Sequence, residues 1–536
     1  MKLSELLRDR TFETLQTIDT TIDITDISTN SKQIKKGNLF IAVKGEQADG
    51  HTYIDEAIER GAAAIVIEDR GILSLYSDRI PVIIVENTRR FYARLLSIWF
   101  LHPSRNIKVI GITGTNGKTT VSFLLQHILN NSQSCGLLST VLYDTGNRQC
   151  VAQQTTPDAA IINQLLAEMH NNDLAYCAME VSSHALSQHR VYGIDFHAAI
   201  FTNLTQDHLD YHHGMEEYFL SKTVLFTQLE KDISANDNKN KTTDKSVGIS
   251  TIQSIHNNSL TGFHKDIPRR LSIINIDDAY GQRLCSLAKG RVVTYGVSSK
   301  ADFTATDIDT HLSGVQFAIQ VKDQVFPVKS RLIGIHNVYN ILAAFSYAYE
   351  EGISPQNIIQ AIESFSGVCG RMEALCCGQP FHVFVDYAHT PDAFQVILSS
   401  IKKLSQGKVI AVFGCGGNRD QEKRPLMGEI ASRFADYVVL TNDNPRFEDE
   451  EKIIYDIEKG FAIKRPSFSY DIIPDRKDAI EKALLTAQPD DIVLILGKGH
   501  EDSIMKQGKK HSFSDQKVAE ETLQRMFKKH PLRSIK

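Results

Sequence analysis

The chain has 536 residues, too many for one hydrophobic core, so three or four domains are expected. Hydrophobic residues make up 42% and charged residues 23%, as in ordinary globular proteins, and the formal net charge is −5. This balance indicates neither nucleic acid nor an anionic membrane as the main partner. The eight cysteines contain no CxxC pair, so neither a zinc site nor a disulfide framework is predicted.

The N-terminal stretch MKLSELLRDRTFETLQ has no apolar core segment and does not read as a secretory signal. The longer apolar runs, such as Ala62–Ile67 and Ile492–Leu496, have the length of strands and cannot span a bilayer. We therefore expect a cytoplasmic protein without a membrane-inserted segment, in a compartment that supplies ATP.

The first region, residues 1–103, is predicted to be a small α/β domain. Its apolar runs are Leu39–Val43, Ala62–Ile67 and Val82–Val85. A helical stretch, Tyr53–Arg60, lies between the first two. The sequence His102-Pro103-Ser104 is expected to link it to the next domain, because proline disfavours helix in the residue before it.

The second region, residues 104–335, opens with a strand–turn–helix pattern typical of a P-loop ATPase-like domain. An apolar strand at Lys108–Thr113 precedes a glycine-rich turn and a helix at Thr119–Asn130. Further strands are predicted at Ala175–Met179 and Ala198–Phe201, which suggests a mainly parallel sheet. Residues 231–268 are rich in Asn, Lys, Ser and Thr and are predicted to be a surface insertion.

The loop Gly111–Thr120 (GITGTNGKTT) has the composition of a phosphate cradle. Backbone N–H groups and the start of a helix favour anions, Lys118 supplies charge to phosphates, and the Thr119 hydroxyl suits Mg²⁺. The general pattern has glycine five residues before the Gly-Lys pair, where this chain has Ile112, so the loop is a shortened variant. The loop alone leaves a kinase, a GTPase, a motor and a ligase open.

Three residues beyond this loop are candidates for metal chemistry. Glu180 leaves a strand and suits Mg²⁺, although a glutamate that complements a helix dipole is a common alternative. His208 lies among carboxylates in TNLTQDHLDYHH, which lacks the HExxH spacing of zinc proteases. Lys222 lies on a predicted helix, Met215–Leu229, and by residue type alone it would be a solvated lysine.

The third region, residues 336–536, alternates strands with helices and predicts a Rossmann-like, doubly wound domain. Strands at Lys408–Phe413, Tyr437–Thr441 and Asp491–Leu496 alternate with helices at Leu426–Phe434 and Glu448–Gly460. The segments after the strands, GCGGNRDQEKRP, NDNPR and GKGHED, are dense in glycine and charge. Ligands of such sheets bind at the carboxyl ends of the strands, so these loops predict a binding site.

Several motifs together resemble one known family, the Mur ligases, which build the peptide of peptidoglycan precursors. GTNGKTT, MEVSSHAL, TNLTQDHLDYH, GIHNVYN, GRME, VDYAHTPDA and GCGGNRDQEKRPLMG follow one another in the order that the family has. The resemblance covers almost the whole chain apart from residues 231–268. It implies an ATP-dependent, ADP-forming ligase of three α/β domains that joins an amino acid to a carboxylate.

The resemblance also implies how ATP and two Mg²⁺ ions would be held. The lysine that matches Lys222 is carbamylated by CO₂ in the family, so an amine becomes an anionic metal ligand. Thr119 and Glu180 would hold one ion, and His208 and carbamylated Lys222 the other. The implied ATP contacts are Gly114, Thr115, Asn116, Gly117, Lys118, Thr119 and Thr120, with Asn337, Arg371 and Asp386 from the third domain.

The implied carboxylate substrate is UDP-N-acetylmuramoyl-L-alanyl-D-glutamate. Its dipeptide would meet Gln154, Thr155, Thr156, Ser182, Gln188 and Arg190, and its uridine end Thr29, Ser31, Glu46, Gln47 and Ala48. Two positions depart from the family: Asn30-Ser31-Lys32 replaces the common Asp-Ser-Arg, and Gln154 replaces the common Asn. Both concern the contacts with this substrate rather than the reaction.

The signature Asp443-Asn444-Pro445-Arg446 resembles the family members that add meso-diaminopimelate. Diaminopimelate carries a second amino-acid head that lysine lacks, and its extra carboxylate suits a bidentate arginine. The implied pocket consists of Arg419, Asp443, Asn444, Pro445, Arg446, Gly497 and Glu501.

Other functions stay open at this point. A ligase of the same family could add lysine or another amino acid, and a folylpolyglutamate synthetase shares the ligase plan. A nucleotide-binding P-loop regulator is an alternative from another class, although it would not need a third domain with an amino-acid pocket. We expect a monomer.

Overall fold

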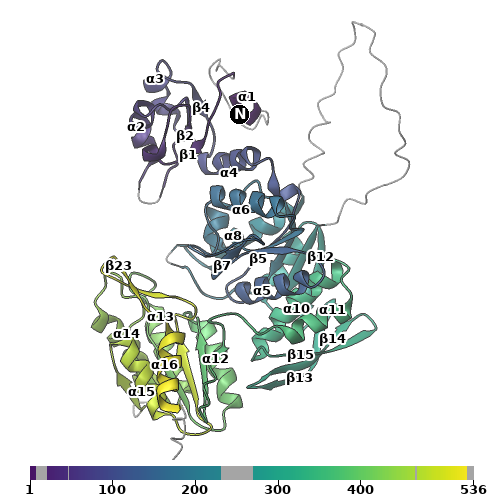
Figure 1. Cartoon of the computed structure of the whole chain (residues 1–536), viewed down its shortest axis with the longest axis vertical. Helices are drawn as coiled ribbons and strands as arrows, with labels where there is room; N and C mark the ends of the chain where they lie inside the picture. Colours follow the sequence, from purple (N-terminus) through teal and green to yellow (C-terminus); the bar gives the residue numbers. More distant parts are fainter. Residues whose placement is uncertain (8–20, 46–47, 210, 231–269, 465–467, 528–536) are drawn as a thin grey trace, which may run out of the picture.

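The computed structural model describes residues 1–7, 21–45, 48–209, 211–230, 270–464 and 468–527. It consists of a small N-terminal unit, a large central unit and a third unit beside the central one (Figure 1). The predicted insertion at 231–268 and the predicted uridine contacts Glu46 and Gln47 lie outside the described residues. No helix among the described residues is long and apolar enough to cross a membrane.

The N-terminal unit is a four-stranded parallel sheet in the order β1-β2-β3-β4. Its strands are β1 (Ile27–Ser28), β2 (Leu39–Ile41), β3 (Ala64–Ile67) and β4 (Val82–Ile84), and its helices are α1 (Leu3–Leu6), α2 (Ile54–Glu59), α3 (Leu73–Tyr76) and α4 (Thr88–Trp99). The strands β2, β3 and β4 are fully apolar and buried because both faces of the sheet are covered, one by α1 and α4 and the other by α2 and α3.

The central unit contains an eleven-stranded sheet in the order β15-β14-β13-β12-β11-β10-β5-β9-β6-β7-β8. The strands β13 to β6 of this order run parallel, and antiparallel strands extend the sheet at both ends. The bounds are β5 (Lys108–Thr113), β6 (Cys135–Leu138), β7 (Leu142–Asp144), β8 (Gln149–Val151), β9 (Tyr176–Glu180), β10 (Phe196–Phe201), β11 (Leu271–Asn275), β12 (Arg291–Gly296), β13 (Phe303–His311), β14 (Gly314–Val321) and β15 (Gln324–Ser330). The strands predicted at 108–113, 175–179 and 198–201 are therefore confirmed as β5, β9 and β10.

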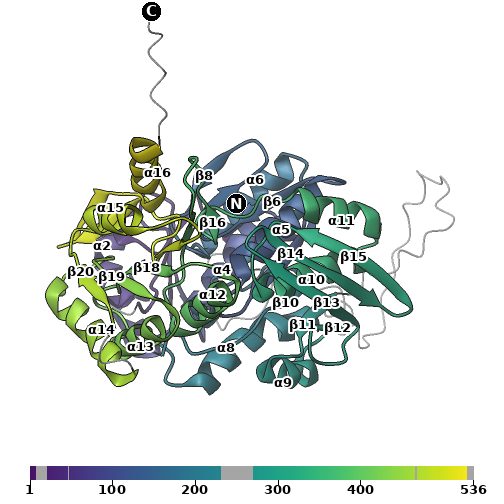
Figure 2. The ribbon, with the colours of Figure 1, turned by 90° about the horizontal axis from the view of Figure 1, so that it is seen from below.

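Helices cover both faces of this sheet (Figures 1 and 2). They are α5 (Lys118–Asn130), α6 (Ala159–Asn171), α7 (Ser183–Ser187), α8 (Met215–Thr227), α9 (Ala279–Leu287), α10 (Ile335–Glu350) and α11 (Pro355–Ser364). Because α10 and α11 pack into the same core as α5 and β11 to β15, the central unit extends to about residue 368. The boundary predicted between residues 335 and 336 is therefore wrong. The sequence could not place it, because the apolar pattern of α10 does not reveal which sheet the helix covers.

The third unit is a six-stranded sheet in the order β16-β17-β21-β18-β19-β20, parallel except for β16. Its strands are β16 (Glu373–Ala374), β17 (His382–Asp386), β18 (Val409–Phe413), β19 (Tyr437–Leu440), β20 (Tyr470–Ile472) and β21 (Ile492–Leu496). The helices are α12 (Pro391–Leu404), α13 (Lys423–Phe434), α14 (Glu450–Lys464), α15 (Arg476–Thr486) and α16 (Asp515–Phe527), and a hairpin is formed by β22 (Ser503–Lys506) and β23 (Lys509–Ser512). The predicted doubly wound sheet is confirmed, with β21, β18 and β19 as direct neighbours.

A buried carboxylate ties α10 to the edge of the central sheet where its parallel strands begin. Glu351 accepts hydrogen bonds from Lys108 Nζ, from the Tyr176 hydroxyl at 3.0 Å and pairs with His197 Nε2 at 2.9 Å. Burial alone would raise the pKa of Glu351, but the hydrogen bonds from His197 and Lys108 lower it to about 2. The carboxylate therefore stays ionised and connects β5, β9 and β10 to the end of α10.

We expect Glu351→Gln to destabilise the central unit by roughly 2–3 kcal/mol at pH 7, because partners of a buried ion pair lose their counter-charge. The pKa of Glu351 is lowered by folding, so its contribution is present above the ordinary pKa of 4.5 and is lost as the pH falls toward 2. Thermal unfolding should show a large difference between variant and parent at pH 7 that shrinks at pH 3.5. Glu350→Gln is the control, because Glu350 pairs with the half-exposed Arg291 and should cost much less. A pH-independent difference for Glu351→Gln would contradict the ion-pair explanation.

Candidate active site at the boundary of two domains

The predicted phosphate-binding loop lies between β5 and α5, and two glycines allow its backbone conformation. Gly114 has φ +148° and Gly117 has φ +88°, and a Cβ atom at these positions would collide with the Thr202 hydroxyl and the Asn340 side chain. Thr202 Oγ1 donates to Asn116 O at 2.6 Å, and Asn116 N donates to Asn203 Oδ1 at 2.9 Å. The turn is thereby held against the end of β10, and α5 starts at Lys118, directly before the predicted start at Thr119.

Two lysines, Lys118 and the buried Lys222, meet at one carbonyl oxygen of this loop. Lys118 Nζ donates to Gly114 O at 2.9 Å and to Thr115 O at 2.8 Å, and Lys222 Nζ donates to Gly114 O at 3.1 Å. Burial lowers the pKa of Lys118 and lowers that of Lys222 well below its usual range, and the positive charge of Lys118 adds to the second shift. The solvated-lysine interpretation of Lys222 is therefore excluded, since the side chain is 2% exposed.

The carboxylate of Glu180 is fully buried at the end of β9 and faces the same loop. It accepts hydrogen bonds from Thr119 Oγ1 at 3.1 Å, from Thr140 Oγ1 at 3.0 Å and from Thr140 N at 2.9 Å. The hydroxyl and the carboxylate are oxygen donors of the kind that Mg²⁺ prefers. Within the described residues, no three His, Cys, Asp or Glu side chains are grouped so that they could hold a metal ion.

His208 and Asp207 follow β10 and lie close enough to Lys118 for its charge to act on both. Burial lowers the pKa of His208 to about 4, so its ring is neutral near pH 7 and has a nitrogen lone pair for a metal. Burial alone would raise the pKa of Asp207, but His208, His389 and Lys423 together lower it. Asp207 was not singled out from the sequence, although its place directly before His208 in TNLTQDHLDYHH would have justified it.

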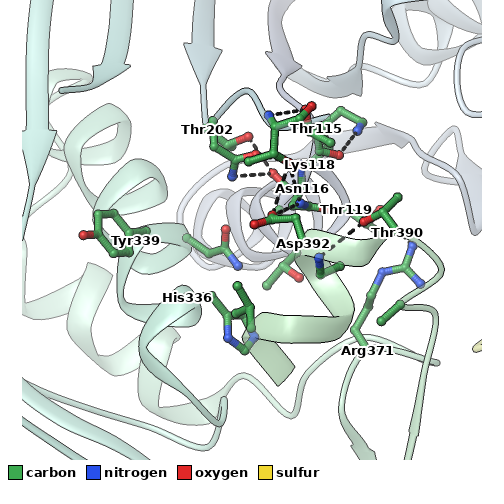
Figure 3. A pocket seen from close by; sticks show the side chains of 18 of the residues that line it. Thr115, Asn116, Lys118, Thr119, Thr202, His336, Tyr339, Arg371, Thr390 and Asp392 are labelled. Carbon is green, nitrogen blue, oxygen red and sulfur yellow. Dashed lines mark hydrogen bonds between the residues drawn. The ribbon is translucent and has the colours of Figure 1, made fainter. Parts of the chain in front are cut away.

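A cavity of about 490 Å³ lies between the central and third units (Figure 3). Its wall in the central unit includes Lys118, Thr119, Glu180 and His208. Its wall in the third unit includes Arg371, Asp386 and Asp392, and α10 contributes His336, Asn337 and Tyr339. All of the predicted metal residues except Lys222, and all three of the residues predicted to close over ATP, line this cavity.

Contacts between the two units cross this cavity at the loop itself. Asn116 Nδ2 donates to Asp392 Oδ2 at 2.8 Å, and Arg371 Nη2 donates to Thr119 Oγ1 at 3.3 Å (Figure 3). The Arg371 guanidinium also lies over the Tyr387 ring, 4.5 Å from its centroid. Asp392 was not predicted as a site residue, because nothing in the sequence places the start of α12 beside a loop some 276 positions earlier.

Asp386 and Asn337 hold backbone and side chains around the cavity. The Asp386 carboxylate accepts from Met372 N at 2.6 Å and from Ala388 N at 2.7 Å, so both oxygens fix the backbone next to Arg371. Burial raises the pKa of Asp386. Asn337 Nδ2 donates to Ile333 O at 2.8 Å, and its oxygen accepts from Asn340 at 2.9 Å.

The residues predicted for the dipeptide end of the substrate gather around Arg190. Its guanidinium donates to Gln154 Oε1 at 2.7 Å, to Thr156 O at 2.9 Å and to Gln188 Oε1 at 2.7 Å. The Thr156 hydroxyl donates to Glu180 O at 2.8 Å, and Ser182 N donates to that hydroxyl at 3.0 Å. Thr155 Oγ1 accepts from Thr140 at 3.1 Å, which links this group to the carboxylate of Glu180.

The residues predicted for the uridine end belong to the N-terminal unit and are not in this cluster. Ser31 is buried and donates to Glu56 Oε2 at 2.7 Å. Thr29 is partly exposed, and Ala48 is exposed beside the undescribed Glu46 and Gln47.

Three loops of the third unit converge where β18, β19 and β21 end, as the alternation predicted. Arg446 Nη1 donates to Gly417 O at 2.8 Å, which joins the loop after β19 to the loop after β18. Asn444 Nδ2 donates to Glu501 Oε2 at 2.8 Å, which joins it to the loop after β21. Gly497 has φ +113°, and a Cβ there would lie 2.7 Å from Asp443 Oδ2, so glycine is required beside this carboxylate.

Charges of both signs meet in these loops. Burial and the nearby Arg419 lower the pKa of Arg446, whereas Asp443 and Glu501 act in the opposite direction. Arg446 itself has φ +54° and is held by the hairpin β22–β23, since its N–H donates to Met505 O at 2.9 Å. Pro445 precedes it, and Gly417 packs against the Pro445 carbonyl. The site therefore has two guanidinium groups and two carboxylates at one sheet edge.

Two buried cations under these loops were missed in the sequence. Arg476 forms a fully buried bidentate pair with Asp515 at 2.7 Å and donates to Asn442 O and Leu496 O, directly before the second and third loops. Lys498 is fully buried and contacts Asn444 and Glu501. A charged residue next to a helix or loop is normally exposed, and the local sequence gives no sign that it is buried. The burial of Arg476 and Lys498 is therefore seen only in the fold.

The two clusters are connected, which defines the class of protein. Arg371 Nη1 lies 3.5 Å from His500 Nδ1, and the ring of Tyr387 lies 5.1 Å from that of His500, so the third loop reaches the nucleotide-type cavity. A phosphate cradle with a buried carboxylate, opposite a charged pocket on a second domain, is the arrangement of an ATP-dependent ligase.

Comparisons with known proteins agree with this class. Family models match for the Mur ligase family catalytic domain (residues 23–99), the Mur ligase middle domain (112–266 and 248–348) and the Mur ligase glutamate ligase domain (370–499). A UDP-N-acetylmuramoyl-L-alanyl-D-glutamate–2,6-diaminopimelate ligase from Aquifex aeolicus is 42% identical over 93% of both chains. A protein of the same name from Clostridium tetani is 37% identical over 98% of this chain and 100% of its own.

Solved structures give the same picture. The structure of a UDP-N-acetylmuramoyl-L-alanyl-D-glutamate–2,6-diaminopimelate ligase covers 98% of this chain and 99% of its own, with a TM-score of 0.64 and 28% identity. A MurF ligase from Thermotoga maritima in complex with ADP has a TM-score of 0.54 and 20% identity over 95% of this chain and 98% of its own, which shows the fold alone. The chain belongs to the Mur ligase family, and it is an ATP-dependent ligase that forms amide bonds.

We expect Gly114→Ala to weaken ADP binding by about 10- to 100-fold, because the new Cβ would displace Thr202 and with it the Asn116 carbonyl. Isothermal titration calorimetry with ADP would measure the affinity. Gly352→Ala is the matched control, since Gly352 also has a positive φ (+89°) but has nothing within 4 Å of its added Cβ. Equal affinities in both variants would rule out the collision as the cause.

Proposed function

We propose that this ligase adds meso-diaminopimelate to the γ-carboxylate of the D-glutamate in UDP-N-acetylmuramoyl-L-alanyl-D-glutamate. The observation that carries the proposal is the convergence of Arg446, Asn444 and Glu501 at one sheet edge that reaches the cavity through His500. The names of the relatives from Aquifex aeolicus and Clostridium tetani, which match almost the whole chain, support the same pair of substrates.

The pocket suits the distal head of diaminopimelate, which carries a carboxylate and an ammonium group. The guanidinium of Arg446, with Arg419 beside it, would bind the carboxylate in a bidentate manner. The carboxylates of Glu501 and Asp443 would bind the ammonium group. Lysine has no carboxylate at that end, so the two arginines would keep an unpaired charge and the complex would be weaker.

In the proposed reaction the γ-phosphoryl group moves from ATP to an oxygen of the D-glutamate γ-carboxylate, and ADP is released. The free amine then attacks the acyl carbon, the bond from that carbon to the phosphate oxygen breaks, and inorganic phosphate leaves. Lys118, the N–H groups of the loop and Arg371 would bind the phosphate oxygens as charge moves. Arg190 and its partners would orient the dipeptide.

Two Mg²⁺ ions would supply charge compensation for the phosphoryl group when bound. Thr119 and Glu180 would hold one of them, and their 3.1 Å separation fits two oxygen ligands of one ion. His208 and a carbamate on Lys222 would hold the other. Only a neutral amine reacts with CO₂, and the burial that lowers the pKa of Lys222 favours that form of the amine.

The amino-acid assignment is tested by offering meso-diaminopimelate and L-lysine separately with ATP, Mg²⁺ and the UDP-muramoyl dipeptide, and measuring phosphate release. We expect the parent enzyme to use diaminopimelate at least about 100-fold more efficiently, and Arg446→Ala to raise its KM by about 100-fold. Arg433→Ala, an exposed arginine of the same domain, should behave like the parent. Equal use of both amino acids would overturn the assignment.

We expect Lys222→Ala to lower the rate of phosphate release by at least about 100-fold, because one anionic metal ligand is lost. A readout that does not depend on activity is the carbamate carbon, seen by NMR after incubation of the protein with ¹³C-bicarbonate. The parent should show this signal, and Lys222→Ala should lack it with an unchanged melting temperature. Full activity of Lys222→Ala would contradict both the carbamate on Lys222 and the second Mg²⁺ ion.

A further inference from the structure

Lys498 is a buried ammonium group directly behind the amino-acid pocket. Its side chain has no exposed surface, and it lies in the loop after β21. Lys498 Nζ donates to Glu501 Oε2 at 2.7 Å and to Asn444 Oδ1 at 3.2 Å. Charged side chains are rarely buried unless they are paired, and here both partners are residues of the proposed pocket.

The contacts of Lys498 determine how Asn444 presents its amide. Asn444 Oδ1 accepts from Lys498 Nζ and also from Met505 N at 2.9 Å. Two donors on one side require the oxygen there, so the Asn444 amide nitrogen faces Glu501. Without the ammonium group, the Met505 N–H alone would hold this orientation.

The same contacts determine which oxygen of Glu501 is available to a ligand. Oε2 accepts from both Lys498 at 2.7 Å and Asn444 at 2.8 Å. Oε1 has no hydrogen-bond partner among the residues that the structure describes. The carboxylate is 31% exposed, so a ligand can approach it.

We propose that Lys498 is a positioning residue of the amino-acid pocket: its ammonium group fixes the Asn444 amide and the Glu501 carboxylate in the orientation that binds the substrate's distal head. It acts through these two residues, because it is itself buried and faces away from solvent. The inference rests on the proposed function, since it assumes that Asn444 and Glu501 bind the amino-acid substrate.

Lys498→Met tests this role, because it keeps the length of the aliphatic chain and removes the charge. Phosphate release would be measured as a function of meso-diaminopimelate, ATP and the UDP-muramoyl dipeptide in turn. We expect the KM for diaminopimelate to rise by about 10- to 100-fold, while the other two KM values change by less than about 2-fold. Lys498→Arg should recover part of the loss, because a guanidinium can also donate to Glu501.

Lys510→Met is the matched control, because Lys510 belongs to the adjacent hairpin and pairs with Asp502 at an exposed position. It should keep all three KM values. The double variant Lys498→Met, Glu501→Gln should raise the KM for diaminopimelate by less than the product of the two single effects, since both changes break one arrangement.

An unchanged KM for diaminopimelate in Lys498→Met, or an equal rise in all three KM values with a lower melting temperature, would overturn the inference. If Lys498→Met does not fold, Lys498→Arg decides: a rise confined to the KM for diaminopimelate supports the role, and an equal rise in all three KM values refutes it. A parent enzyme that ignores diaminopimelate but uses another amino acid would overturn the proposed substrate alone, and the KM of the variants would then be measured for that amino acid.

Discussion

Two ammonium groups, those of Lys118 and the buried Lys222, share the carbonyl oxygen of Gly114, and this is the constraint around which the active site is built. Lys118 and Lys222 lie at 2.9 Å and 3.1 Å from this oxygen, and burial disfavours the charge of each. Backbone carbonyl dipoles, those of Gly114 and Thr115, do not compensate two cations so close together. Anionic groups at this point, such as phosphate oxygens or a carbamate on one of the two amines, would relieve the repulsion.

The loop can hold both lysines because contacts with neighbouring residues fix its backbone. The two glycines of the turn lie against Thr202 and Asn340, and Thr202 and Asn203 of the β10 end bind the turn through hydrogen bonds. The buried Glu180 supplies the negative charge on the other side of Thr119. The cradle therefore depends on three parallel strands, β5, β9 and β10, whose carboxyl ends meet at one edge of the sheet.

The third unit also has functional loops at the carboxyl ends of neighbouring parallel strands, but the charges beneath its loops differ. Its neighbouring strands β21, β18 and β19 also end in charged loops, but here buried cations, Arg476 and Lys498, support the loops from beneath. Contacts of Arg371 with Thr119 and with His500 place this edge beside the first one. An amide ligase needs both edges, because the activated carboxylate and the amine must meet.

The order of motifs, the strand at Lys108–Thr113 and the alternation of the third region already determined the family, the nucleotide loop and the three loops after β18, β19 and β21. These features are local: glycine at positions with positive φ, apolar runs and helix starts are written in short segments. The tertiary structure decided the rest. The burial of Lys222, Lys498 and Arg476, the contact of Asp392 with Asn116, and the packing of α10 on the central sheet join residues that are far apart in the chain. Whether a charged side chain is solvated or buried depends on those distant neighbours, and no short stretch of sequence specifies them.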